Sequence, residues 1–167
     1  DYIDFTYNDE NRIQTISFNG TIRYEYSYDS SGRISILKDI HNNNIYFYSY
    51  DLAGRLKKVT DKDCNIITYT YNDYGFISDV SYEIGWISRA VEYHYDSDTQ
   101  QYDYSLYQVG STTITKNYNY DDDSLKRLNN IELLIGSTSL SQTFYYGDSY
   151  VDPTMGNATN RIYSIYY

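Results

Sequence analysis

Few side chains in this sequence could do chemistry, and they are far apart. His41 and His94 are the two histidines, and Cys64 is the one cysteine. Nucleophilic catalysis needs a histidine beside a nucleophile and an acid, and a zinc site needs several clustered ligands. We expect His41 and Cys64 in turns between strands, and His94 between two tyrosines of a strand. The sequence therefore predicts a protein that is not an enzyme and holds no metal or cofactor.

Two acidic stretches are candidates for calcium binding. One contains Asp96 and Asp98, and the other contains Asp121, Asp122 and Asp123. A calcium loop needs about six oxygen ligands in a fixed order, and neither stretch supplies the glycine and the distal glutamate of an EF-hand. Solvated acids in turns are the favoured interpretation.

The balance of charge argues against nucleic acid as a partner. The formal net charge is −10, and the acidic residues are spread along the chain. Phosphate binding requires clustered basic residues, and the nearest approach to a cluster, which acidic residues flank, is Arg55, Lys57, Lys58 and Lys62. No apolar run approaches the roughly 18 residues of a membrane span. Because the sequence starts without methionine, we interpret it as a fragment of a longer protein.

The elements that position these residues belong to one repeated unit. The sequence has 25 tyrosines and is poor in the helix formers Ala, Leu and Met, so an all-β fold is predicted. Near-copies of a unit of about 21 to 26 residues form a single array over residues 1–167. The units are regular in residues 1–92 and longer in residues 93–167. Each has a tyrosine at the equivalent position: Tyr7, Tyr28, Tyr50, Tyr71, Tyr95, Tyr120 and Tyr146.

Each unit reads as a strand, a turn and a second strand. In the first strand an aromatic residue stands two positions before the repeated tyrosine, so both rings lie on one face. Examples are Tyr26, Tyr48 and Tyr69. One hairpin alone is marginal in water, so successive hairpins are expected to lie side by side in one antiparallel sheet.

The turn has a pattern of its own. It starts with an acid or amide, as in Asp29 and Asp51, whose side chain can accept hydrogen bonds from the N–H groups ahead. In a hairpin loop of about four or five residues, the position three residues later needs a positive φ. That position holds Asn11, Gly32, Gly54 and Gly75 in the first four units.

An arginine follows the turn in the first three units: Arg12, Arg33 and Arg55. We expect each arginine to stack on an aromatic ring or to pair with the acid of the next unit, and so to join the hairpins. The aliphatic residues that follow are three positions apart, as in Ile34 and Leu37. This spacing indicates either a β-bulge or a strand covered on both faces, and the sequence does not decide between them.

The pattern Tyr-x-Tyr-Asp-x-x-Gly-Arg-[Ile/Leu] resembles the YD repeat, also called the RHS (rearrangement hot spot) repeat. It is clearest in residues 26–34 and 48–56, and the resemblance covers most of the chain. Proteins of this family include wall-associated and polymorphic-toxin proteins of Gram-positive bacteria. The resemblance implies a curved, spiralling sheet in a secreted or cell-surface protein, forming part of a shell. Its implied partners are other repeats of the parent protein and an enclosed C-terminal domain.

Other functions stay open at this point. An exposed row of rings, with Tyr26, Tyr48 and Tyr69 as candidates, would bind a carbohydrate or a receptor. The loop "DPTMG" at residues 152–156 is similar to the Asp-Pro-x-Gly segment of self-cleaving members of the family, but has one residue too many. Rings packed along neighbouring hairpins explain the pattern without a ligand, so a structural scaffold is favoured. Unpaired edges of such a sheet are expected to pair with another copy.

Overall fold

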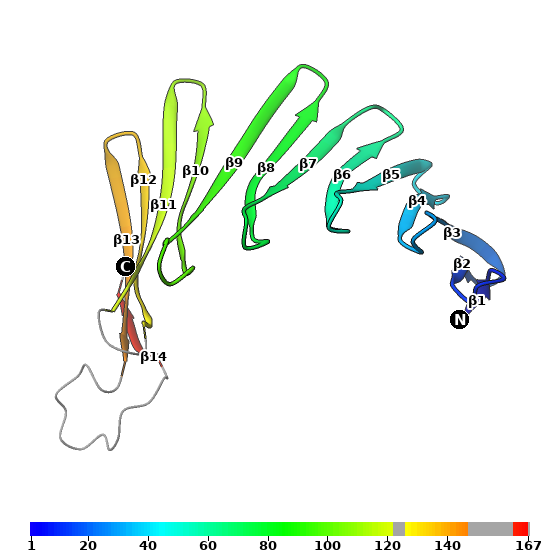
Figure 1. The fold of residues 1–167 in the computed structure, drawn as a ribbon, viewed down its shortest axis with the longest axis horizontal. Coiled ribbons are helices and arrows are strands. Elements are labelled where there is room, and N and C mark those ends of the chain that lie inside the picture. Colours follow the sequence, from blue (N-terminus) through cyan, green and yellow to red (C-terminus); the bar gives the residue numbers. More distant parts are fainter. Residues whose placement is uncertain (122–125, 147–161, 167) are drawn as a thin grey trace. The chain divides into compact units, whose positions relative to one another are not determined.

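The computed structural model describes residues 1–121, 126–146 and 162–166, and Figure 1 shows its strands. Throughout these ranges the chain forms strands and turns, with no helix. It divides into two compact units, residues 1–89 and residues 90–167. Within each unit, strands that follow one another in the sequence pair antiparallel. The predicted all-β fold of tandem hairpins is confirmed.

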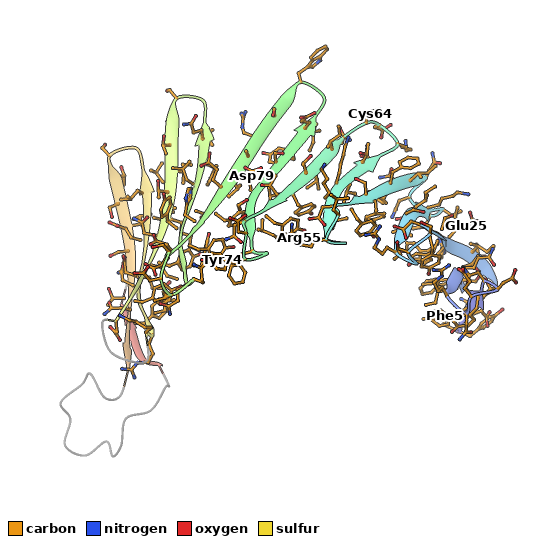
Figure 2. All side chains as sticks on the ribbon, in the orientation of Figure 1. Phe5, Glu25, Arg55, Cys64, Tyr74 and Asp79 are labelled. Carbon is orange, nitrogen blue, oxygen red and sulfur yellow. The ribbon has the colours of Figure 1, made fainter. Side chains whose placement is uncertain are left out.

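The first unit holds four hairpins in chain order. Its strands are β1 (Ile3–Tyr7), β2 (Ile13–Phe18), β3 (Thr21–Tyr28), β4 (Ile34–Asp39), β5 (Asn44–Tyr50), β6 (Leu56–Asp61), β7 (Ile66–Tyr71) and β8 (Ile77–Ile84). The turns that begin with Asp or Asn, which we call the Asp turns, close each hairpin at one end of the strands. The connections between hairpins lie at the other end, and Figure 2 shows Arg55 and Tyr74 at the first end and Cys64 at the second.

The second unit repeats the arrangement with longer strands. Strand β9 (Ile87–Tyr95) begins in residues 1–89 and continues into the second unit, which also holds β10 (Tyr102–Val109), β11 (Thr112–Tyr120), β12 (Leu128–Ile135), β13 (Thr138–Tyr146) and β14 (Ile162–Tyr166). Strands β9, β11 and β13 have 9 residues each, whereas β1 has 5 and β2 has 6. The longer spacing of the later repeats therefore comes in part from longer strands.

A β-bulge directly after the Asp turn explains the spacing of three between the aliphatic residues. Tyr28 pairs with Ile34, and Tyr26 pairs with Leu37, which leaves Ser35 as the extra residue. The same shift of register occurs in the other hairpins that an Asp turn closes. The aliphatic pair consequently faces the aromatic pair on one side of the sheet, and a second covered face is not needed.

The two faces of the sheet in the first unit differ in chemistry. Tyr48 pairs with Val59 on one face, while the neighbouring pair, Ser49 with Lys58, lies on the other. Among the described residues no large side chain is fully buried, and the buried polar residues are Ser17 and Asp39. The tyrosines of the repeats are mostly half-buried. Stability must therefore come from contacts between adjacent hairpins, as in other repeat proteins.

The Asp turns have the predicted geometry. In the second hairpin, Asp29 Oδ1 accepts hydrogen bonds from the N–H groups of Ser31 and Arg33, both at 2.9 Å. Gly32 follows with a φ of +79°. In the equivalent positions of the first, third and fourth hairpins, φ is 59° at Asn11, 83° at Gly54 and 87° at Gly75.

A turn of the same kind also connects two hairpins at the opposite end of the strands. There Asp61 Oδ1 accepts hydrogen bonds from the N–H groups of Asp63 and Asn65, both at 2.9 Å. Cys64 takes the place of the glycine, with a φ of 63°, and is exposed. The sequence placed Cys64 in a turn but did not reveal this equivalence, because cysteine has no preference for positive φ.

Candidate functional site

The recurring site of this protein is a contact between the arginine of one hairpin and the tyrosine of the next. The guanidinium carbon lies over the tyrosine ring in each case. Its distance from the ring centre is 4.6 Å for Arg12 and Tyr28, 4.3 Å for Arg33 and Tyr50, and 4.3 Å for Arg55 and Tyr71. These distances are within the range of a cation–π interaction.

The same tyrosines bond back to the backbone of the preceding hairpin. Each hydroxyl donates to the carbonyl of the residue directly after the arginine. The distances are 2.6 Å from Tyr28 to Ile13, 2.7 Å from Tyr50 to Ile34 and 2.7 Å from Tyr71 to Leu56. We call the ring contact and this hydrogen bond together the clasp, because they join two hairpins at two points.

The second unit contains the hydrogen bond of the clasp in a modified setting. The Tyr120 hydroxyl donates to the carbonyl of Tyr102 at 2.8 Å. Tyr102, which follows the turn, also has its ring 5.6 Å from the ring of Tyr95 and 4.6 Å from that of Tyr118. Where the turn lacks an arginine, contacts between aromatic rings therefore stand in place of the contact between arginine and tyrosine.

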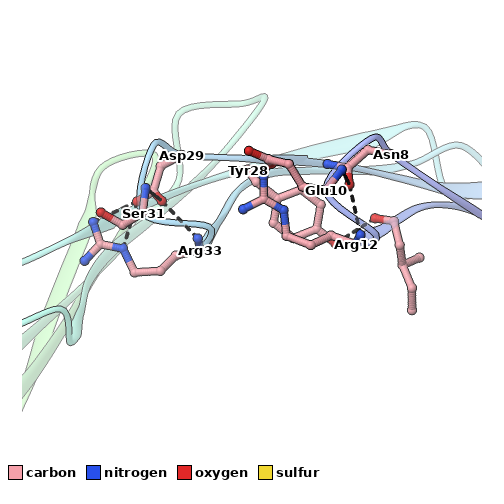
Figure 3. A network of polar contacts seen from close by, with 8 residues as sticks. Asn8, Glu10, Arg12, Tyr28, Asp29, Ser31 and Arg33 are labelled. Carbon is pink, nitrogen blue, oxygen red and sulfur yellow. Dashed lines mark hydrogen bonds and ion pairs between the residues drawn. The ribbon is translucent and has the colours of Figure 1, made fainter.

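The Asp turn holds the arginine of the clasp in place. Arg33 Nε donates to Asp29 Oδ2 at 2.8 Å, and its Nη2 lies 2.7 Å from the same oxygen (Figure 3). Arg55 Nε donates in the same way to Asp51 Oδ2 at 2.7 Å. The backbone N–H and the side chain of Arg33 lower the pKa of Asp29, although partial burial opposes this effect. The acid belongs to the same hairpin as its arginine, so the link to the next hairpin is made by the ring.

The first clasp differs because Asn8 replaces the acid. Asn8 Oδ1 still accepts the N–H of Arg12 at 2.9 Å, but its amide group offers no carboxylate to the side chain (Figure 3). Arg12 pairs instead with Glu10. Its Nε is buried and has no hydrogen-bond partner among the residues that the structure describes.

The glycine of the Asp turn also makes room for the arginine of the preceding hairpin. A Cβ atom added at Gly32 would lie 2.6 Å from Arg12 Nη1. At Gly54 the nearest atom would be Arg33 Nη1 at 3.5 Å, and at Gly75 an equivalent arginine atom lies at 3.6 Å. The sequence predicted these glycines from the turn alone. Their closeness to the previous arginine could be read only from the pairing of hairpins.

The tyrosines named as candidates for a sugar platform lie within the sheet's own packing. Tyr26, Tyr48 and Tyr69 are half-buried. Burial is the largest cause that raises the pKa of Tyr48, followed by the neighbouring tyrosines, which include Tyr26 and Tyr69 of the adjacent hairpins. These three rings are therefore near enough to influence one another across hairpins, and none of the three is a fully exposed platform for a ligand.

The structure leaves the candidate chemical residues apart from one another. His41 lies in a turn and contacts Arg23, while the His94 ring stacks on Tyr104 with centroids 4.2 Å apart. Asp96 accepts hydrogen bonds from its own turn, including one of 2.7 Å from the N–H of Thr99. Among the described residues no three His, Cys, Asp or Glu side chains are grouped so that they could hold a metal ion.

Three predictions concern residues for which the structure gives no side-chain description. Asp122 and Asp123 lie outside the described residues, and so does the loop "DPTMG" at 152–156. The side chain of Tyr146, at the end of β13, is also outside the described part. Within the described ranges, no helix is long and apolar enough to span a bilayer.

Comparison with known proteins gives a likeness of fold. No family model and no curated protein matches this sequence. A crystal structure of TcdB2-TccC3 without its hypervariable C-terminal region covers 88% of this chain, with a TM-score of 0.72 and 14% identity. A crystal structure of TcdB2-TccC3 covers 85%, with a TM-score of 0.70 and 15% identity. The Tc holotoxin pore of Photorhabdus luminescens covers 88%, with a TM-score of 0.71 and 16% identity.

This chain spans only 9% of the length of each of those chains. The likeness therefore concerns a local arrangement of hairpins and not a whole protein. Over the part that it spans, this chain has the fold of these Tc toxin chains.

Proposed function

We propose that this chain is a structural, non-enzymatic segment of an RHS/YD-repeat β-shell. In this role its hairpins form part of a wall that encloses or presents another domain of a secreted or cell-surface toxin-type or adhesion-type protein. Its partners are other repeats of the same polypeptide and the enclosed domain. The Gram-positive origin stays a prediction from the sequence resemblance.

The clasp is the observation that carries this proposal. It recurs at the three successive junctions between the first four hairpins, with ring distances of 4.6, 4.3 and 4.3 Å. Each clasp uses the turn of one hairpin and the strand of the next, so hairpins of this kind can be added one after another. A contact that joins each hairpin to the next is expected in a wall built from repeated hairpins.

The fold comparison supports the same role. The similar structures are those of Tc toxin components and of a holotoxin pore. Their chains are about ten times longer than the stretch that matches here, which agrees with this chain forming a segment of a larger wall. The alternative of a carbohydrate- or receptor-binding module has no comparable support, because the rings assigned to it are half-buried.

Limited proteolysis of the complete polypeptide that carries this sequence tests the proposal. If the hairpins form part of a shell, an enclosed domain resists protease in the native protein. It becomes accessible when Tyr50→Leu and Tyr71→Leu weaken two clasps. A Tyr74→Leu variant is the matched control, because Tyr74 is exposed in a turn. Equal digestion of every domain in all variants would overturn the shell function.

A further inference from the structure

One hairpin tip of the first unit is apolar and fully exposed. Ile84, Gly85, Trp86 and Ile87 connect β8 to β9, and the Trp86 side chain is as exposed as in an extended peptide. Ile84 and Ile87 are both more than half exposed. Trp86 is the one tryptophan of the sequence. Leaving a tryptophan and two isoleucines in water gains nothing for the folded state.

The turn itself does not require a tryptophan, as the chain shows twice. Gly85 has a φ of 56°, and the equivalent turns begin at Gly110 and Gly136 with φ of 62° and 57°. These two glycines are followed by Ser111 and Ser137. The position after the glycine therefore accepts a small polar residue without change of the turn. Trp86 is best explained by a contact outside its own hairpin.

An apolar hollow in the second unit has suitable chemistry for that contact. It lies on β12 and β13, has a volume of about 530 Å³, and is lined by Ile131, Leu133, Leu140 and adjacent polar residues. Leu133 and Leu140 are paired across the two strands. Leu140 is 60% exposed, so part of the hollow's apolar wall faces water.

We propose that Trp86 of one copy inserts into the Ile131–Leu133–Leu140 hollow of a second copy of this chain. The contact joins the apolar tip and the apolar hollow, and it buries side chains that are otherwise in water. Its area is small, so it makes a weak, reversible association. Trp86 is the anchor residue, as is typical of tryptophan in protein interfaces. This association uses neither edge of the sheet and does not depend on the shell function.

Analytical ultracentrifugation over a wide range of protein concentration tests the proposal. The wild-type chain is expected to associate as its concentration rises, and W86S is expected to weaken this association by about tenfold or more. Serine is the matched replacement because Ser111 and Ser137 occupy the same turn position. Leu140→Ser should have the same effect from the hollow's side, and combining both changes should add little, since either one removes the contact. Tyr74→Ser removes an exposed aromatic residue at the other end of the strands and should leave association unchanged.

Fluorescence gives a second, direct readout because Trp86 is the sole indole. Its emission should shift to shorter wavelength as the protein concentration rises, and Leu140→Ser should abolish the shift. Association that is unchanged in W86S would overturn the proposal in favour of pairing between sheet edges. A shift that requires phosphatidylcholine vesicles and not a higher protein concentration would also overturn it, and would assign the tip to a bilayer surface. A wild-type chain that stays monomeric with unshifted emission would overturn it as well.

Discussion

The guanidinium carbon of Arg33 lies 4.3 Å from the centre of the Tyr50 ring, and the Tyr50 hydroxyl donates to the carbonyl of Ile34 at 2.7 Å. Arg33 and Ile34 are adjacent in the second hairpin, and Tyr50 belongs to the third. Two consecutive residues of one hairpin thus hold a single side chain of the next. This arrangement adds a side-chain link to the backbone ladder that already pairs β4 of the second hairpin with β5 of the third.

The hydroxyl half of the clasp can be removed without the ring. Tyr50→Phe should lower the free energy of unfolding by about 1 kcal/mol, because the partly buried carbonyl of Ile34 loses its hydrogen bond. Urea denaturation followed by circular dichroism measures the change. Tyr74→Phe removes a hydroxyl from an exposed turn tyrosine and should be nearly neutral. Equal effects of the two variants would show that the bond to Ile34 contributes nothing.

The ring half of the clasp should appear as a coupling between two residues. In a double-mutant cycle with Arg33→Gln and Tyr50→Leu, we expect a coupling of about 0.5 to 1 kcal/mol, since each change removes one partner of the cation–π contact. The pair Arg33→Gln and Tyr71→Leu is the control, because Tyr71 contacts Arg55 instead. Additive effects in the first cycle would contradict a ring contact in solution.

Much of this architecture follows from sequence patterns of short range. The alternation of Tyr48 and Tyr50 predicted a strand, and Asp51 with Gly54 predicted the turn after it. These features are readable because each depends on residues fewer than about five positions apart. The expected stacking of Arg55 on an aromatic ring could be stated from composition, but the choice of ring could not.

The longer-range features needed the pairing of strands. The bulge at Ser35 decides which face Leu37 occupies, and a spacing of three was compatible with two solutions. The hydrogen bond from Tyr50 to the Ile34 carbonyl joins residues 16 positions apart. Because the acceptor is a backbone oxygen, the bond does not require a particular residue type at position 34. Its one signal in the sequence is the nearly constant distance from each arginine to the tyrosine that it contacts.

The first clasp should become stronger when its missing carboxylate is restored. Asn8→Asp should raise the free energy of unfolding by about 1 kcal/mol, because Arg12 Nε is buried without a hydrogen-bond partner while Arg33 Nε has Asp29. Thermal or urea unfolding measures the gain. The expected gain is smaller at high salt, because the ion pair is then screened.

The fourth hairpin offers a matched control for that substitution. Asn72 starts its Asp turn, and Phe76 stands where the other turns have an arginine. Asn8 and Asn72 are each followed by an aspartate, so the carboxylate added by either substitution lies next to one negatively charged neighbour in the sequence. Asn72→Asp should therefore give no comparable gain. Equal stabilisation by both variants would refute the role assigned to the guanidinium.

Replacing the turn glycines with alanine should lower the free energy of unfolding, by an amount that differs between the turns. Gly54→Ala should cost about 1 to 2 kcal/mol, since φ is +83° and an added Cβ has only ordinary contacts. Gly32→Ala should cost more, because its Cβ would lie 2.6 Å from Arg12 Nη1 and would push that group from Tyr28. In an Arg12→Ala background the two glycine substitutions should cost the same. If Gly32→Ala still cost more than Gly54→Ala in that background, the additional cost would not come from the displacement of Arg12.

Alkaline pH should destabilise the protein through its half-buried tyrosines. Burial raises the pKa of Tyr48, and it also raises the pKa of Tyr26 and Tyr120. An unfolded tyrosine ionises near pH 10, whereas these residues in the folded state ionise only at higher pH. The stability that they contribute is therefore complete below about pH 10 and is lost as the pH rises through their folded pKa values. Urea denaturation at a series of pH values should show this loss, and Tyr48→Phe should make it less steep. An unchanged slope in Tyr48→Phe would contradict the packing of Tyr48 between hairpins.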